Sequence, residues 1–405
     1  MKNYLKDFPV KEQLILESKE LELAPLLVNA HIHSPYSFSS FTGLEQAFEM
    51  SQNENVKVLG INDFYVTDGY DEFAQLAHQN KIFPLFNIEA IALSKKLQDQ
   101  GIRVNDPNNP GRTYTCGKGL NFPSILVGEM IESVKTESQR QIVEMIEKLN
   151  AWLKEIDMEF QFTYDEVRRR FARRLVRERH IAQALRHAVF EHYRDDPQRN
   201  DALQKIYGGV PSGVDMHNEA ALENELRNNI LKAGKKAFVP EDEKAFLSIE
   251  QVCEIFLKAG GIPCYPVLLD DSSGNITEFE VDRESLYQNL VDWDIWCIEL
   301  IPQRNRLEIM EPFVRYFYEK GFVVTLGTEH NAPGLTPVAP YCSNKPLTGF
   351  LRQVNYEGAC VIAAHQYLQA LGECGFIDEH QKAKPETRNE LTRLGNVVIK
   401  RWMGK

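Results

Sequence analysis

The 405-residue sequence has no long hydrophobic run, which excludes a membrane-spanning helix. One of its longest apolar stretches, residues 21–30, is far shorter than the roughly 20 residues that are needed to cross a bilayer. The first 20 residues are rich in Lys and Glu, whereas a secretory signal would be apolar there. We therefore expect a cytoplasmic protein without a membrane anchor.

Paired cysteines and an excess of basic charge are also missing. The seven cysteines are scattered without a C-x-x-C pair or zinc-ribbon spacing, so we expect reduced thiols. The 46 Lys and Arg are outnumbered by 58 Asp and Glu, which gives a net charge of -12. This balance disfavours a dedicated duplex-binding protein and leaves a small or nucleotide-like substrate open.

The sequence does contain an alternation of short apolar runs and amphipathic stretches, which is typical of an α/β fold with parallel strands. Strands are expected at 26–30, 56–61, 82–88, 262–265, 295–300 and 322–326, and helices at 43–53, 70–79, 248–258 and 306–320. Long, charged helical patterns over 124–156 and 164–193 interrupt this alternation. We expect a barrel in two parts, 1–123 and 246–345, with a helical insertion at 124–245 and a C-terminal helical extension at 346–405.

The strongest local signal is the sequence His31-Ile32-His33 at the end of the first apolar run. Residues two apart in a strand point the same way, so both imidazoles can reach one metal ion. The alternative is a pair of hydrogen-bonded histidines at a strand end. Polar residues follow three other expected strands, namely Asp63, Glu89 and Glu329 with His330. Because barrel strands converge at their C-terminal ends, these side chains would meet in space, although each carboxylate alone could be a helix cap or a loop residue.

Five short segments occur in a fixed order along residues 26–335: His31-x-His33-Ser34-x-Tyr36-Ser37, Ile61-Asn62-Asp63, Asn87-Ile88-Glu89, Ala259 to Pro266 and Leu326 to His330. Together they resemble the PHP (polymerase and histidinol phosphatase) superfamily. The resemblance implies a metal-dependent phosphoesterase on a distorted (β/α)7 barrel, with metals at the C-terminal strand ends. Within the insertion, Arg177 to Leu185 and Lys232 to Pro240 resemble the branch that cleaves nucleoside 3′,5′-bisphosphates and short RNA.

The resemblance also implies a set of metal ligands: His31, His33, Glu89 and Glu329, the last in place of the family's aspartate. Two nitrogen and two oxygen donors suit Zn, Mn or Fe, and we expect one to three ions. The positions of three family histidines have changed, to Phe64, Tyr265 and Asn331. Candidate replacement ligands are Asp63, His330, Cys264, Tyr265, Asp215 and His217.

These changes affect the expected mechanism, because family members use two or three ions to hold a phosphate and activate a water. We expect a phosphoesterase that acts on a small phosphorylated metabolite or nucleotide, with Asp63 or His330 as a base or an additional ligand. The alternatives are a single-metal hydrolase or lyase of another substrate class, and a non-catalytic descendant that binds a ligand. The sequence does not indicate the oligomeric state.

The segment 105–119 is dense in Gly, Asn and Pro, which predicts a shaped loop. Arg112 and Lys118 add positive charge to it, and this combination suits an anionic ligand. We expect the loop to lie over the metal centre, where Arg112 and Lys118 would bind phosphoryl oxygens. An ordered surface turn is the alternative.

Seven arginines lie between Arg168 and Arg179. At helical spacing they cover more than one face of a helix. Pairing with the acidic helix at 129–155 is the outcome we favour. Binding of RNA through counterion release is the alternative.

Overall fold

The computed structural model describes residues 2–122, 129–270 and 274–404. The expected start of the insertion at residue 124 lies outside these residues. Among the helices described, none combines the length and the apolar character that crossing a bilayer requires.

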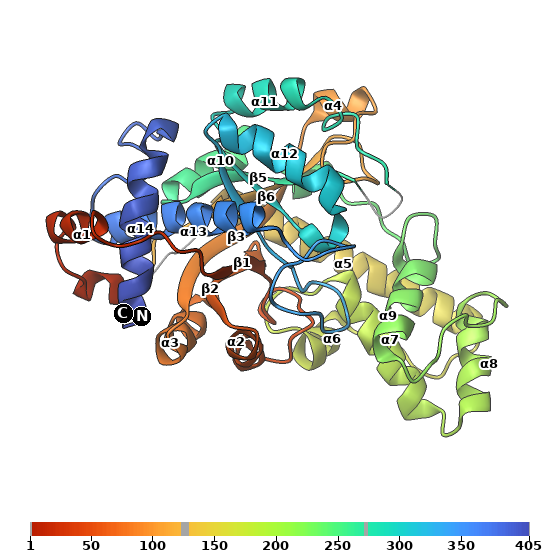
Figure 1. Cartoon of the computed structure of the whole chain (residues 1–405). Helices are drawn as coiled ribbons and strands as arrows, with labels where there is room; N and C mark the ends of the chain where they lie inside the picture. The colour runs from red at the N-terminus through yellow and green to blue at the C-terminus, as the bar shows by residue number, and fades with distance from the viewer. Residues whose placement is uncertain (1, 123–128, 271–273, 405) are drawn as a thin grey trace.

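Seven strands form a single sheet whose spatial order follows the chain. They are β1 (Leu27–Ile32), β2 (Val56–Phe64), β3 (Phe83–Leu93), β4 (Arg112–Lys118), β5 (Ile262–Val267), β6 (Cys297–Leu300) and β7 (Val323–Leu326). The strand β4 is antiparallel to both of its neighbours, and the other pairs are parallel. A bridge between Ile32 and Glu329 joins the two edges, so the sheet nearly closes into a barrel with helices around it (Figure 1). The predicted α/β barrel with seven strands is confirmed.

Barrel closure depends on a close approach between β1 and the segment after β7. A Cβ at Gly327 would lie 2.3 Å from the Cβ of His31, so only glycine fits at this position. The N–H of His33 then donates to the carbonyl of Glu329 at 2.7 Å. Glu329 and His330 both have positive φ, 61° and 55°, a conformation that non-glycine residues adopt at a cost of about 1–2 kcal/mol each. The turn after β7 is therefore specified by its contact with β1.

Alternate side chains of the strands pack into two different cores. Outward side chains such as Leu59 and Ile298 join the core of α2 (Leu44–Asn53), α3 (Tyr70–Asn80), α10 (Ile249–Lys258), α11 (Arg283–Asp292) and α12 (Leu307–Glu319). The side chains that alternate with these along each strand, such as Val58 and Cys297, point to the other face of the sheet. They pack with α1 (Lys11–Ser18), α13 (Gly349–Ala370) and α14 (Arg388–Trp402). Because α13 is buried along nearly its whole length, the C-terminal helices belong to the packing of the barrel.

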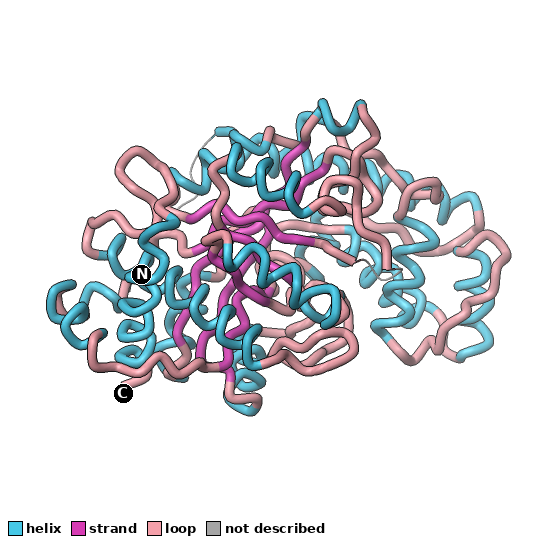
Figure 2. Tube along the Cα trace, turned by 45° about the horizontal axis from the view of Figure 1, so that its top comes forward, coloured by secondary structure: helices cyan, strands magenta, loops and turns pink. Residues whose placement is uncertain are grey.

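A third hydrophobic core belongs to helices between β4 and β5. These helices are α5 (Glu129–Glu155), α6 (Tyr164–Phe171), α7 (Glu178–His192), α8 (Asp196–Ile206) and α9 (Glu219–Leu226), followed by a π-helical turn at Arg227–Leu231. They extend to one side of the central strands (Figures 1 and 2). The predicted apolar face of α5, which includes Met145 and Leu149, is buried in this core.

The pattern over 164–193 forms two helices, α6 and α7, instead of one continuous helix. Residues 172–177 are non-helical because other partners take their backbone groups. The N–H of Val176 donates to Gln139 Oε1 at 2.9 Å, and Gln139 Nε2 donates to the carbonyl of Val176 at 3.2 Å. Tertiary hydrogen bonds from α5 therefore outweigh the local helix preference.

The second half of the expected loop at 105–119 is a strand. Residues 112–118 form β4, because the run Thr113-Tyr114-Thr115 has β-branched and aromatic side chains that favour extended backbone. Only the residues before Gly111 make the shaped turn. Asn105 joins turn and strand, since its side chain accepts from the N–H of Tyr114 at 2.7 Å and donates to the Tyr114 carbonyl at 2.9 Å.

Candidate metal centre

Three of the predicted metal ligands meet inside the barrel: His31 at the end of β1, His33 directly after it, and Glu89 on β3. The Nε2 atoms of the two histidines lie 3.3 Å apart, and His33 Nε2 lies 3.5 Å from a carboxylate oxygen of Glu89. Two nitrogen ligands of one tetrahedral ion, each at about 2.1 Å, would lie roughly 3.4 Å apart. All three residues are buried. The residues present therefore fit a single divalent ion.

The ring of His33 supports this fit. It stacks on Phe38, with ring centroids 4.8 Å apart, and its Nδ1 is buried without a hydrogen-bond partner. Burial, and then the neighbouring His31, hold the pKa of His33 well below its usual value. His33 is therefore a neutral imidazole that can offer a lone pair.

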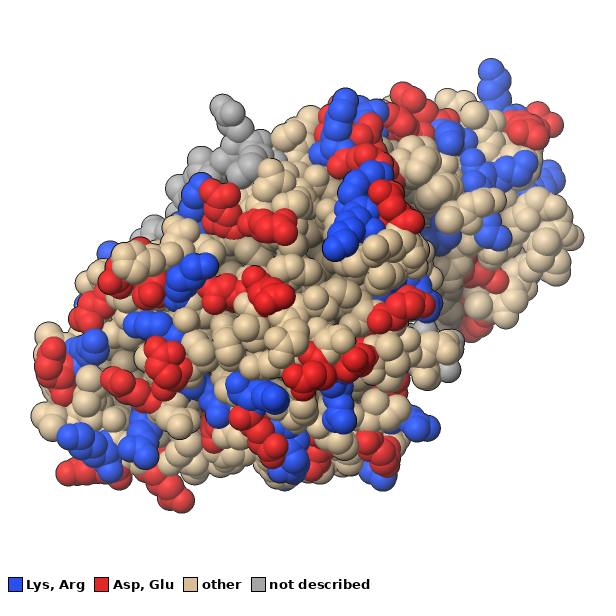
Figure 3. All heavy atoms as spheres, turned by 90° about the horizontal axis from the view of Figure 1, so that it is seen from above, with Lys and Arg blue, Asp and Glu red and all other residues tan. Residues whose placement is uncertain are grey.

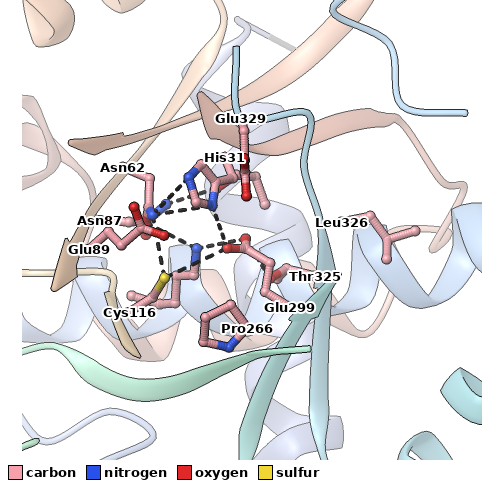
Figure 4. A network of polar contacts seen from close by, with 12 residues as sticks. His31, Asn62, Asn87, Glu89, Cys116, Pro266, Glu299, Thr325, Leu326 and Glu329 are labelled. Carbon is pink, nitrogen blue, oxygen red and sulfur yellow. Dashed lines mark hydrogen bonds and ion pairs between the residues drawn. The ribbon is translucent and has the colours of Figure 1, made fainter. Parts of the chain in front are cut away.

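Glu299, on β6, orients His31, and sequence reasoning missed it. Its Oε1 lies 2.6 Å from Nδ1 of His31, and both side chains are buried (Figure 4). This contact places the imidazole proton on Nδ1, so Nε2 carries the lone pair that faces His33. The signal that could have revealed Glu299 is a charged residue inside the apolar run Cys297–Leu300.

Lys118 lies inside the barrel on β4 and is fully buried. Its Nζ donates to Glu299 Oε2 at 2.6 Å and to Asn62 Oδ1 at 3.1 Å. Burial alone would lower the pKa of Lys118, but the Glu299 carboxylate outweighs it and raises that pKa. Burial would likewise raise the pKa of Glu299, but Lys118 and His31 lower it to about 2. The two side chains form a buried ion pair.

Glu89 is a buried carboxylate without such a partner. Burial, followed by the nearby Glu329 and Glu299, raises the pKa of Glu89 well above its usual range. Among the described residues, no Lys or Arg lies within ion-pair distance of it, and its close contact is with His33. A cation at this position would relieve the cost of burying the charge.

Glu329, the fourth predicted ligand, is outside this three-residue group. It forms an ion pair with Arg304 and accepts a hydrogen bond from Asn331 Nδ2 at 2.6 Å. Its carboxylate is therefore bound by neighbouring side chains, although it lies close enough to influence Glu89.

The structure does not bring Asp63 and His330 into the group. Asp63 accepts two hydrogen bonds from Ser34, one from the backbone N–H at 2.6 Å and one from the hydroxyl. His330 uses Nδ1 to contact Thr328 Oγ1 at 2.7 Å and Nε2 to contact the carbonyl of Thr336 at 3.0 Å. Both side chains are held by neighbours, in positions that support the loops around the group.

Three other candidate replacement ligands are also engaged elsewhere or lie deeper, and the fourth, Asp215, is exposed in the insertion, where it accepts a hydrogen bond from the backbone N–H of His217 at 3.0 Å. Tyr265 donates its hydroxyl to Glu280 at 2.8 Å. Cys264 is fully buried in the barrel core. His217, in the insertion, lies 3.0 Å from Asp196, and both are about half exposed.

A cavity of about 1530 Å³ lies between the barrel and the helical insertion, and Glu89 and Glu329 form part of its wall. Seven basic side chains also line it: Arg112, Arg177, Arg179, Arg227, Lys232, Arg304 and Arg306. Clefts between two parts of a protein are usual places for small ligands, and this one is lined by an unusually large number of charged groups. The predicted loop residue Lys118 is not part of this lining, because it lies inside the barrel.

Some of these basic groups already have carboxylate partners. Arg112 pairs with Glu241 at 2.5 Å, and Arg227 and Lys232 share Glu178. Three others, Arg177, Arg179 and Arg306, have no carboxylate partner among the described residues. The guanidinium of Arg177 stacks on the ring of Phe64, at 4.3 Å from its centroid, and that of Arg179 donates to Asn224 at 3.2 Å.

The pKa of Arg179 is consistent with the lack of a carboxylate partner. Burial, and then the nearby charge of Arg227, lower the pKa of Arg179 to about 10. An anion in the cavity would compensate both guanidinium groups, Arg177 and Arg179.

The arginine-rich segment pairs with acidic residues, but the partners differ from the expected ones. Arg170 pairs with Glu166 and Glu191, Arg173 with Glu72, and Arg174 with Asp68. Among the described residues, no ion pair joins this segment to the acidic helix α5. The C-terminal half of the arginine-rich segment turns instead toward β2 and the cavity. On the face shown in Figure 3, basic and acidic side chains are intermixed.

Comparison with known proteins places the fold among solved structures. No protein-family model matches the sequence, and no curated protein matches it. The fold is similar to that of a proposed metal-dependent phosphoesterase from Bifidobacterium adolescentis, with a TM-score of 0.52 and 18% identity over 78% of this chain and 94% of that chain. An amidohydrolase from Chromobacterium violaceum matches with a TM-score of 0.49 and 15% identity over 77% of this chain and 89% of that chain. At these identities, the first likeness establishes an α/β barrel fold.

Proposed function

We propose that the protein is a metal-dependent hydrolase, and specifically a phosphoesterase that acts on a small phosphorylated metabolite or nucleotide through a metal-activated water. The observation that carries the proposal is the convergence of His31, His33 and Glu89 beside a cavity lined by seven basic side chains. Imidazole and carboxylate donors suit Zn, Mn or Fe, and guanidinium groups bind phosphoryl oxygens in a forked geometry. The protein of similar fold from Bifidobacterium adolescentis is a proposed metal-dependent phosphoesterase, which supports the same reaction class.

Two sets of residues would have different roles, one in binding the metal and the other in binding the substrate. On the barrel side, His31 and His33 would offer nitrogen donors and Glu89 an oxygen donor. The chemistry that a divalent ion supplies in such a site is polarisation of a phosphoryl oxygen and acidification of a water. Arg177 and Arg179, which also line the cavity, would bind the anionic oxygens of the substrate and orient it.

The test is a set of phosphatase assays on metal-free protein reloaded with Zn, Mn or Fe(II). The substrates would include p-nitrophenyl phosphate as a monoester, bis-p-nitrophenyl phosphate as a diester, and panels of sugar phosphates and nucleotides. We expect phosphate or nitrophenol release with at least one metal, and loss of it in His33→Ala. Absence of turnover by protein that contains its metal would contradict the proposal.

A second candidate is a single-metal hydrolase or lyase of another substrate class, such as sugar-like molecules. It is favoured by Phe64 and Tyr265, which stand where the resemblance implies further histidine ligands. Phe64 has no donor atom and packs under Arg177, while the hydroxyl of Tyr265 is committed to Glu280. Turnover of lactones or sugar acids in the same assays, without turnover of phosphoesters, would select this candidate. Ligand binding without any turnover would indicate a non-catalytic binding protein.

A further inference from the structure

The barrel interior contains a second group of side chains with metal-binding atoms, directly beside the first. It consists of His31, Cys116 and Glu299, all buried. The two groups share His31, whose Nε2 faces His33 and whose Nδ1 faces Glu299. Ligand geometry alone would therefore allow two ions, one on each side of the His31 ring, with the Nδ1 proton lost to solvent when the second ion binds.

The second group already contains a cation, the ammonium of Lys118. Its Nζ lies 2.6 Å from Glu299 Oε2 and 3.1 Å from Asn62 Oδ1. Thr325 adds a hydrogen bond to the same Oε2 at 3.2 Å, while Oε1 contacts His31. Both oxygens of Glu299 are thus bound by side chains of the protein.

Charge distinguishes the two groups, whereas ligand geometry does not. The ion pair of Lys118 and Glu299 is fully buried, so water does not screen the repulsion between its ammonium and an incoming divalent ion. In the first group, the carboxylate of Glu89 lacks a Lys or Arg partner among the described residues. One group is compensated by the chain itself, and the other requires a cation from solution.

We propose that the buried ammonium of Lys118 takes the place of a second divalent ion, so that the protein binds one ion, through His31, His33 and Glu89. The inference rests on the proposed metal centre and adds to it a stoichiometry and a role for Lys118. In this arrangement Glu299 is a positioning residue, because it holds the His31 ring on one side and the Lys118 ammonium on the other.

The test counts metal ions per chain. Metal-free protein is incubated with excess Zn²⁺ or Mn²⁺, desalted and analysed for metal by mass spectrometry. We expect one ion in the wild type and two in Lys118→Met, which keeps an unbranched side chain that is one atom shorter and leaves Glu299 without its cation. In the double variant Lys118→Met/Glu299→Gln we expect one ion again, because the vacated carboxylate donor is also lost.

A spectroscopic readout is independent of turnover. Electron paramagnetic resonance of the Mn²⁺-loaded wild type should show the six-line signal of an isolated ion, and Lys118→Met should show the broadening caused by a neighbouring ion. Circular dichroism checks that each variant is folded. If Lys118→Met does not fold, Lys118→Gln replaces it, since its amide retains a hydrogen bond to Glu299 without the charge, and the expectation is again two ions.

The outcomes separate this inference from the proposed function. Two ions in the wild type would overturn the inference and leave the metal centre intact. One ion in folded Lys118→Met or Lys118→Gln would show that Lys118 does not substitute for an ion. No ion in the wild type would overturn both the inference and the proposed metal centre.

Discussion

The carboxylate of Glu329 forms an ion pair with the guanidinium of Arg304 at the edge of the cavity. In this pair the carboxylate of the fourth predicted ligand is bound to a side chain of the protein, and Arg304 adds a positive charge near the site. We expect Arg304→Met to free Glu329 and to tighten divalent-ion binding by about tenfold, since about 1 kcal/mol of like-charge repulsion is also removed. Competition with a chromophoric chelator measures the dissociation constant.

The matched control for this prediction is Arg306→Met. Arg306 lines the same cavity, so its removal changes the local charge without releasing Glu329. Equal effects of the two substitutions would assign the gain to charge alone, and weaker binding in Arg304→Met would contradict the prediction.

Removal of the metal should destabilise the folded protein, because an ion that binds the folded state alone contributes to its stability. An ion present at 100 times its dissociation constant stabilises by about 2.7 kcal/mol. We therefore expect EDTA to lower the Tm by several degrees and Zn²⁺ or Mn²⁺ to restore it, as measured by differential scanning fluorimetry. His33→Ala should abolish the metal-dependent shift, whereas His217→Ala, an exposed histidine of the insertion, should retain it. An identical shift in both variants would place the ion elsewhere.

The buried Asp63 should make stability depend on pH. Burial raises the pKa of Asp63 to about 7, from 3.8, in spite of two hydrogen bonds from Ser34. The folded state therefore binds a proton more tightly than the unfolded chain between about pH 4 and pH 7, and the free energy of unfolding falls as pH rises through this window. The shift corresponds to about 4 kcal/mol.

Asp63→Asn isolates this contribution. Asparagine has the shape of the protonated acid and can keep both contacts with Ser34, so we expect a flatter pH profile and higher stability than wild type at pH 8. Urea unfolding at pH 4.5 and pH 7.5, with a chelator present, measures the difference. Parallel profiles for the two proteins would show that Asp63 keeps an ordinary pKa.

Gly327→Ala tests the contact that closes the barrel. The added Cβ would lie 2.3 Å from the Cβ of His31, so either β1 or the turn after β7 must move. We expect a loss of about 1–3 kcal/mol in the free energy of unfolding, together with weaker metal binding, because His31 is displaced. At Gly349, an added Cβ meets nothing within 4 Å, so Gly349→Ala should change stability by less than about 0.5 kcal/mol. Normal stability and metal binding in Gly327→Ala would contradict the close approach.

The barrel could be predicted because its strands and outer helices carry strong local signals. His31, His33 and Glu89 could be placed together because parallel strands run toward the same edge of a sheet, although β3 continues past Glu89 to Leu93. The strand β4 was missed because the Gly, Asn and Pro residues before it dominated the pattern, although Thr113 to Thr115 favour a strand.

The partners of the predicted residues could not be read from the sequence. Lys118 faces Glu299 because β4 and β6 flank β5 in a particular register, and register is a tertiary property. Arg304 reaches Glu329 from a short 3-10 turn, Pro302–Arg304, that follows β6. A sequence pattern gives the position of a charged group along the chain, but the group that compensates it depends on which strands become neighbours.

Closure of the sheet between β1 and the turn after β7 also has a consequence for biosynthesis. His31 and the carboxylate that orients it, Glu299, are 268 residues apart, so the ribosome completes most of the chain before they can meet. Contacts of such long range form slowly, because a large loop must close before they contribute any stability. The nascent chain thus carries His31 long before Glu299 can orient it, so we expect the proposed metal centre to reach its final geometry late in folding.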